Sequence, residues 1–108
     1  MAMVTRFDVY LVNLDAEPTS DAKNTRPCVV VSPDEMNGNI SSVMIAPLSA
    51  VTANYPTRVN VNFLKNERSI VLDQLRTVDR VRLVKKIGEI EKGVQQEVLL
   101  RLREMFEE

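Results

Sequence analysis

Residues 26–33 read Arg-Pro-Cys-Val-Val-Val-Ser-Pro, and this stretch decides the fold of the chain. A continuous apolar run that opens at one proline and is closed by a second is typical of a buried central strand. We therefore predict such a strand between Pro27 and Pro33. Cys28 is expected to be a small buried hydrophobe beside the valines of this strand.

Segments on both sides of this run also have strand composition, and turn-forming residues separate them. Residues 34–39 are expected to form a turn or one helical turn, and the Asn37-Gly38 pair suits positive φ angles. Asp79 is expected to cap a short turn, and Gly88 to be a bulge or bend. Residues 16–25 are polar and aperiodic, which predicts a mobile surface loop. The additional predicted strands are residues 7–15, 42–49, 57–63, 69–72 and 83–90.

The last segment, residues 92–107, has a different periodicity. Val94, Val98, Leu102, Met105 and Phe106 recur at helical spacing, with charged and amide side chains between them. This pattern predicts one amphipathic terminal helix. Five or six short strands followed by a helix indicate a mainly β or α+β domain, built as a strongly bent antiparallel sheet or small barrel.

The composition sets limits on the chemistry. With 108 residues the chain is expected to form a single domain, 1–108. It has no histidine and one cysteine, which excludes Ser-His-Asp and Cys-His catalysis, internal disulfides and the usual zinc sites. We expect no metal and no cofactor. The sequence has neither a secretory signal nor an apolar run of membrane-spanning length, so a cytoplasmic protein without a membrane partner is expected.

The charge is unevenly distributed along the chain. The net charge is only −1, but residues 55–86 carry eight basic and three acidic groups, a local balance of +5. Two interpretations are open: a surface that faces backbone phosphates, or the solvated face of a β-rich region.

Six motifs lie in a characteristic order and spacing along nearly the whole chain. They are Asp-Val-Tyr-Leu-Val-Asn-Leu-Asp at 8–15, Lys-Asn-Thr-Arg-Pro-Cys-Val-Val-Val-Ser at 23–32, Ile-Ala-Pro-Leu-Ser at 45–49, Asn-Tyr-Pro-Thr-Arg-Val at 54–59, Val-Leu-Asp-Gln-Leu-Arg-Thr-Val-Asp at 71–79 and Leu-Val-Lys-Lys-Ile-Gly at 83–88. With these motifs the chain resembles the MazF/PemK family of toxin endoribonucleases, the mRNA interferases of type II toxin–antitoxin systems.

The resemblance implies a strongly curved, SH3-like antiparallel barrel with a C-terminal helix, in a homodimer. It also implies sequence-specific, ribosome-independent and metal-independent cleavage of single-stranded mRNA. The products would carry a 2′,3′-cyclic phosphate and a 5′-hydroxyl, and translation and growth would be inhibited. A cognate MazE-like antitoxin is the implied protein partner.

Three residues are the candidates for catalysis. Arg26 precedes Pro27, so its guanidinium projects from a stiff junction between loop and strand, and its planar fork can neutralise charge on a pentacoordinate phosphorus. Ser49 stands where the family carries Thr or Ser, and its hydroxyl can donate to a phosphate oxygen or orient the attacking 2′-hydroxyl. Asp21 stands where the family often has Glu, and Thr19 replaces a usual Gly. These two departures weaken the hypothesis that Asp21 has a catalytic or base-reading role.

A second set of residues is expected to bind the RNA. Gln74 can bond a base edge, and Arg76 can hold a phosphate or stack on a base. The alternative is that Arg76 pairs with Asp73 or with the backbone. The full expected RNA-binding set is Thr25, Tyr55, Arg58, Gln74, Arg76 and Thr77.

Two other functions fit the same architecture. One is a non-enzymatic binder such as the gyrase-poisoning toxin CcdB, which resembles this family in fold. That toxin ends in Trp-Gly-Ile, whereas this chain has no Trp and ends in Met-Phe-Glu-Glu. The other is an inactive toxin relic that only binds antitoxin. The departures at Thr19 and Asp21 favour this alternative, whereas the intact Arg26 and Ser49 argue against it.

Overall fold

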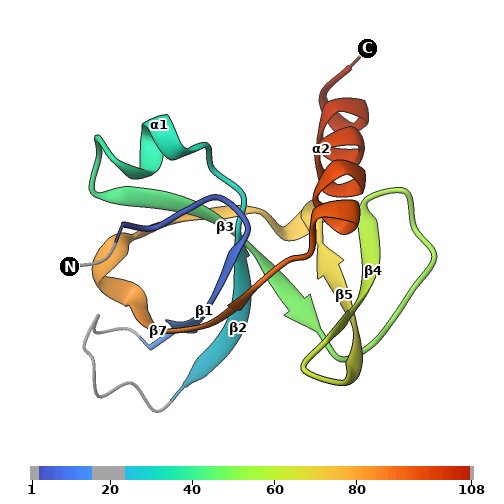
Figure 1. Cartoon of the computed structure of the whole chain (residues 1–108), viewed down its shortest axis with the longest axis horizontal. Coiled ribbons are helices and arrows are strands. Elements are labelled where there is room, and N and C mark those ends of the chain that lie inside the picture. Colours follow the sequence, from blue (N-terminus) through green and yellow to red (C-terminus); the bar gives the residue numbers. More distant parts are fainter. Residues whose placement is uncertain (1–2, 16–23, 108) are drawn as a thin grey trace.

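Strand β3 (Ser42–Ser49) joins the two halves of the domain. The computed structural model describes residues 3–15 and 24–107, and in these the strands form one seven-stranded sheet of order β4-β5-β3-β2-β1-β7, with β6 also paired to β3. Figure 1 shows the sheet curling into a half-barrel beside the β4–β5 hairpin. The remaining elements are β1 (Asp8–Asn13), β2 (Thr25–Val30), α1 (Asp34–Asn37), β4 (Arg58–Phe63), β5 (Asn66–Val71), β6 (Arg76–Asp79), β7 (Leu83–Glu89), α2 (Lys92–Phe106) and the 3₁₀ turns η1 (Leu72–Gln74) and η2 (Arg80–Arg82).

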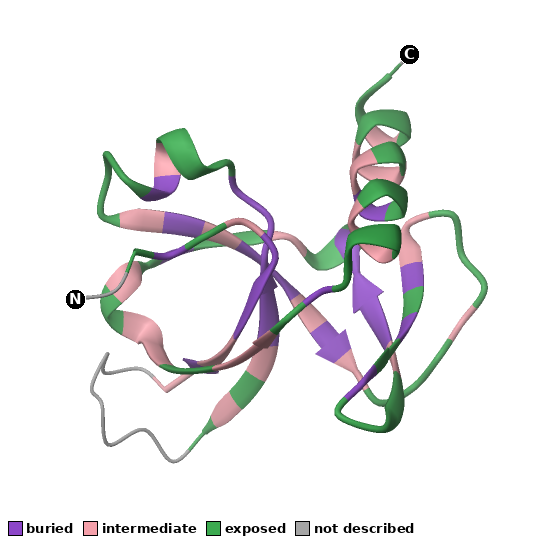
Figure 2. Ribbon diagram, in the orientation of Figure 1, coloured by how far each residue is buried: buried purple, intermediate pink, exposed green. Residues whose placement is uncertain are grey.

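Strand β2 is the buried central strand that the sequence predicts. It lies between β1 and β3, and its alternate side chains enter two different cores. Val29 lies in the core that also contains β4, β5 and α2, whereas Cys28 and Val30 lie in the core of the half-barrel. Figure 2 shows this buried centre where the strands cross. Both faces of β2 are covered, which is why the run contains almost no polar residue.

Strand β1 is shorter than predicted, but the predicted alternation of its faces is confirmed. Val9 and Val12 stand on opposite faces of the strand, and each is buried in a different core. The register of β1 with β7 shifts between Val9 and Tyr10 and again between Leu11 and Val12. The predicted bend at Gly88 is confirmed opposite the first shift. A Cβ at Gly88 would meet the Phe63 ring at 2.8 Å, so close packing of this ring requires glycine there.

The turn predictions are confirmed in part: Asp79 caps η2 by accepting a hydrogen bond from the Val81 N–H. The helical turn at α1 is confirmed, but the positive φ expected at Asn37-Gly38 is wrong, since φ of Gly38 is −88°. Asn37 is instead the buried end of α1, where its side chain accepts from Ser32 Oγ and donates to Ser32 O. Positive φ occurs in the two-residue turn of the β4–β5 hairpin, at Leu64 and Lys65.

The C-terminal segment forms the predicted amphipathic helix. Val98 of α2 is fully buried, and Val94, Leu99, Leu102 and Met105 pack against the same core. Phe106 departs from the prediction: it is 75% exposed at the end of the helix. Among the described residues, no helix is long and apolar enough to cross a membrane.

Candidate active site

Strands β2 and β3 separate at the point where the sequence places its principal catalytic candidate. Their pairing runs from Val30–Ile45 to Cys28–Pro47 and stops there. Among the described strands, residues 25–27 then pair with β1 alone, while the end of β3 pairs with β5. Figure 1 shows the two strands diverging. We call this opening, between residues 25–27 and 48–49, the fork.

A hollow of about 370 Å³ lies at the fork. Side chains two positions apart point to the same face of a strand, so the pairs 26 and 28 on β2 and 45 and 47 on β3 face this space together, and Gln74 of η1 and Arg76 of β6 also line it. The fork hollow is lined by Leu14, Asn24, Arg26, Cys28, Ile45, Pro47, Gln74 and Arg76. Two guanidinium groups and two amides thus stand around a largely apolar floor.

The guanidinium groups of Arg26 and Arg76 in the fork hollow are available to bind an anion. Within the described parts of the chain, neither Arg26 nor Arg76 makes a side-chain hydrogen bond or ion pair. Asp73, which the sequence offered as a partner for Arg76, pairs with Arg58 at 3.4 Å instead. Two unpaired guanidinium groups in one hollow are suited to phosphate oxygens.

The Cys28 thiol at the floor of the hollow is a poor nucleophile. Burial raises the pKa of Cys28 to about 11, although the nearby Arg76 and Arg26 act in the opposite direction. The group is therefore a neutral thiol at neutral pH, as expected of a small buried hydrophobe. The described residues also contain no group of three or more His, Cys, Asp or Glu side chains that could hold a metal ion.

Ser49 stands on the other side of the fork. Continuing the β2–β3 register two residues beyond Cys28–Pro47 would bring Arg26 and Ser49 opposite one another. The strands have separated by then, and Ser49 pairs with Ser69 of β5. Its Oγ accepts a hydrogen bond from the Val51 N–H at 3.1 Å, so the hydroxyl proton can be donated to a ligand.

The other candidates do not line the fork hollow. Thr25 pairs with Asn13, and Thr77 pairs with Met44; each stands one position from an arginine of the hollow and so points to the opposite face of its strand. Asp21, like Thr19, lies outside the described residues. The roles of these residues stay predictions. Asn24, Pro47 and Leu14 were missed as lining residues, although Asn24 could have been found from its spacing of two from Arg26.

Tyr55 and Arg58 lie in a second hollow, of about 320 Å³. Arg58 Cζ is 4.9 Å from the centre of the Tyr55 ring. Burial alone would raise the pKa of Asp73, but hydrogen bonds from Arg58, the backbone and Thr57 outweigh it and leave the pKa below its usual value. Asp73 therefore remains a carboxylate that fixes Arg58 in place.

Much of the basic segment has a structural role. Arg80 donates to the carbonyl oxygens of Asn37 and Ile40, and Arg82 donates to those of Asn13 and Asp15. Lys86 pairs with the buried Asp8 at 3.2 Å, and this hydrogen bond raises the pKa of the lysine. The segment is therefore not one continuous phosphate-facing surface, because several of its cations are held by carbonyl or carboxylate oxygens.

Comparison with known proteins identifies the family. Residues 5–106 match the model of the PemK-like, MazF-like toxins of type II toxin–antitoxin systems. The chain belongs to this family. The toxin is also similar to MazF from Deinococcus radiodurans (TM-score 0.77, 21% identity, 97% of each chain covered). An endoribonuclease in complex with its cognate antitoxin from a mycobacterial species has a TM-score of 0.80 and 19% identity, over 94% of this chain and 92% of that one.

These likenesses confirm the predicted family and the predicted fold, a curled antiparallel half-barrel with a C-terminal helix. The family places the toxin in a toxin–antitoxin pair. Arg26 and Ser49, the residues that the resemblance marks for catalysis, stand on the two sides of the fork, and Gln74 and Arg76 lie in the same hollow as Arg26.

Proposed function

We propose that this toxin is an endoribonuclease that cleaves single-stranded mRNA, without a metal and without the ribosome, at specific short sequences. The observation that carries the proposal is the fork hollow, where Arg26 and Arg76 have no side-chain partner among the described residues and stand over a neutral floor. The endoribonuclease named among the structural neighbours supports the same reaction class. The proposed outcome is arrest of translation and growth.

The proposed reaction is an in-line transfer within the RNA. The 2′-oxygen forms a bond to phosphorus as the bond from phosphorus to the 5′-oxygen breaks. The 2′-hydroxyl loses its proton and the leaving 5′-oxygen gains one, so the ends are a 2′,3′-cyclic phosphate and a 5′-hydroxyl. Arg26 would hold two nonbridging oxygens, whose negative charge increases in the transition state. Ser49 would donate to the phosphate from the opposite side of the fork.

Two protein partners complete the proposal. Structural neighbours include MazE–MazF complexes from Deinococcus radiodurans, and we propose a cognate antitoxin of the same kind for this toxin. An acidic segment of the antitoxin would compete with RNA for the unpaired arginines. The toxin itself is proposed to be a homodimer, in which two forks would act on one RNA surface.

The direct test is incubation of the purified toxin with a long single-stranded RNA in the presence of EDTA, followed by mapping of the new 5′ ends. We expect cuts at one short recurring sequence, with 5′-hydroxyl ends and a rate that EDTA leaves unchanged. The same RNA annealed to its complement should be cut poorly, because its bases are stacked and paired. Intact RNA after incubation with folded toxin would contradict the proposal.

Binding of single-stranded RNA should weaken with increasing salt, because the arginines of the fork hollow displace counterions from phosphates. Replacing Arg76 with alanine should flatten the slope of log affinity against log salt concentration by roughly 0.7, the loss of one phosphate contact. Fluorescence anisotropy with a labelled RNA at several salt concentrations measures both slopes. A matched replacement of the exposed Arg103 on α2 should leave the slope unchanged. An affinity independent of salt would contradict the role of the fork arginines.

A further inference from the structure

The second hollow is built around a tight turn at the start of β4. The Arg58 N–H donates to Tyr55 O at 3.0 Å, which closes a four-residue turn with Pro56 at its second position. The turn brings the first and last side chains together, and the Arg58 guanidinium lies over one face of the Tyr55 ring. The ring is 58% exposed. We call this space the turn hollow; it is lined by Ala53, Asn54, Tyr55, Pro56, Arg58, Asn60, Glu97 and Arg101.

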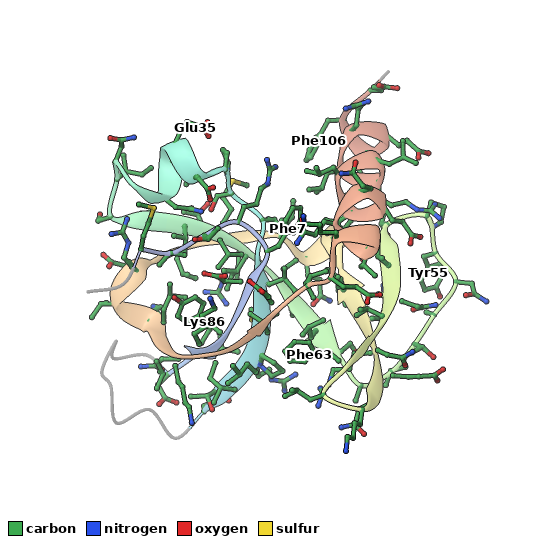
Figure 3. All side chains as sticks on the ribbon, viewed as in Figure 1. Phe7, Glu35, Tyr55, Phe63, Lys86 and Phe106 are labelled. Carbon is green, nitrogen blue, oxygen red and sulfur yellow. The ribbon has the colours of Figure 1, made fainter. Side chains whose placement is uncertain are left out.

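The turn is held rigidly against the body of the domain. Asp73 accepts from Thr57 Oγ1 at 3.2 Å and from Arg58 Nε at 3.4 Å, and the Leu72 N–H donates to Thr57 O at 3.0 Å. Three hydrogen bonds thus join the turn to η1. An exposed aromatic ring on a fixed backbone, with a cation over one face, is a preorganised stacking platform. In Figure 3, Tyr55 lies at the outer side of the β4–β5 half, well away from Phe106.

The charges of the turn hollow differ from those of the fork hollow. Arg58 pairs with Asp73, and Arg101 pairs with Glu97 at 3.6 Å, so each cation has a carboxylate beside it. A phosphate would have to compete with these carboxylates, whereas a neutral ring would not. The polar groups between the ion pairs are the amides of Asn54 and Asn60, which bond to each other at 3.4 Å. Amides offer donors and acceptors that match the edge of a nucleobase.

We infer that the turn hollow is a stacking subsite for one unpaired nucleobase of the RNA whose phosphate occupies the fork hollow; this inference rests on the proposed function. The volume of about 320 Å³ is at the small end of ligand sites, which span roughly 300–1,000 Å³. The base stacks on the Tyr55 face that Arg58 leaves open, with its edge toward Asn54 and Asn60. The subsite thus binds a base and the fork binds a phosphate.

Both hollows are tied to η1, so an RNA strand that runs past this turn would enter both. Asp73 fixes Arg58 of the turn hollow, and the next residue, Gln74, lines the fork hollow. The base in the turn hollow would then belong to the strand that is cut, and Tyr55 becomes a residue that selects where the RNA is cut.

The test uses an abasic scan. The probe is a short single-stranded RNA that spans the mapped cut site, with a 2′-deoxy sugar at the attacking nucleotide so that it binds without cleavage. A set of such probes lacks the base at one position at a time. Binding is measured for the wild-type toxin, Tyr55→Leu, Tyr55→Phe and the matched control Phe106→Leu, which replaces an aromatic ring that is 75% exposed on α2.

We expect one abasic position to weaken wild-type binding by roughly 5- to 150-fold, the usual range for a base stacked on an aromatic side chain. In Tyr55→Leu that position-specific loss should disappear, because the ring is already gone, while losses at other positions should remain. Tyr55→Phe keeps the ring and should behave as wild type, and so should Phe106→Leu. The same expectations apply to the cleavage pattern of the ribose-intact RNA.

Two results would overturn the inference while leaving the proposed function standing. In the first, Tyr55→Leu shows the wild-type abasic profile. In the second, Tyr55→Leu weakens every probe equally and sediments as a smaller species, which would assign the ring to a subunit interface. If the wild-type toxin neither binds nor cuts single-stranded RNA, the proposed function fails and the inference fails with it.

Discussion

Replacing Arg26 with alanine is expected to slow RNA cleavage by about 10²–10³-fold, the usual cost of removing one preorganised donor from a developing anion. The side chain stands on the edge segment of β2, outside the apolar run, and makes no side-chain hydrogen bond or ion pair within the described chain. Its loss should therefore leave the fold unchanged. Single-turnover cleavage of the mapped site, with circular dichroism of the same sample, measures both quantities.

The controls separate geometry from charge. Arg26→Lys keeps the charge but loses the planar fork, so it should restore little of the rate. Arg103→Ala removes the same charge from the exposed end of α2 and should cleave at the wild-type rate. If folded Arg26→Ala cuts RNA as fast as the wild-type toxin, the catalytic assignment is wrong.

The bounds of three strands were predicted closely from the sequence, whereas β5 begins three residues before its predicted start because its first residues are polar and exposed. The bounds of β3 are as predicted, and those of β4 and β7 differ by one residue. Strand β6 was missed because, of its four residues, only Val78 is buried. Its pairing comes from β3, where Val78 lies opposite Val43. A four-residue strand with one buried side chain shows no hydrophobic periodicity in the sequence. Such a strand forms because it pairs with a neighbouring strand in the folded sheet.

The candidate site was predictable residue by residue, but its shape was not. The motifs marked Arg26, Gln74 and Arg76, and all three line one hollow. The period of two explains why Arg26 and Cys28 share a face, but not why Gln74 and Arg76 join them. The fork forms because β3 pairs with β2 up to Pro47 and with β5 from Leu48 onward. This change of partner is set by the arrangement of the whole sheet and cannot be predicted from one segment of sequence. Proline has no N–H for a ladder, so it is compatible with a position where pairing stops. Asp73 and Arg58 are 15 residues apart in the sequence, so their ion pair could not be predicted from local spacing either.

Truncation of the buried side chain at the start of η1 is the second large effect that we expect. Leu72 is fully buried at the start of η1, directly before Asp73 and Gln74. Leu72→Ala should lower the free energy of unfolding by about 2–5 kcal/mol, through lost burial and the cavity left behind. For a domain with a typical stability of about 5–15 kcal/mol this is a large fraction. Urea unfolding at one fixed protein concentration measures the change.

The matched control is Leu100→Ala on α2, where the side chain is 51% exposed and the stability should change by no more than about 0.5 kcal/mol. A loss below about 1 kcal/mol in Leu72→Ala would show that the site collapses around the shorter side chain. Because η1 joins Arg58 to Gln74, the cavity should also loosen both hollows in the molecules that remain folded. RNA affinity should then fall by more than the unfolded fraction accounts for, whereas a fall equal to that fraction would show that η1 does not couple the hollows.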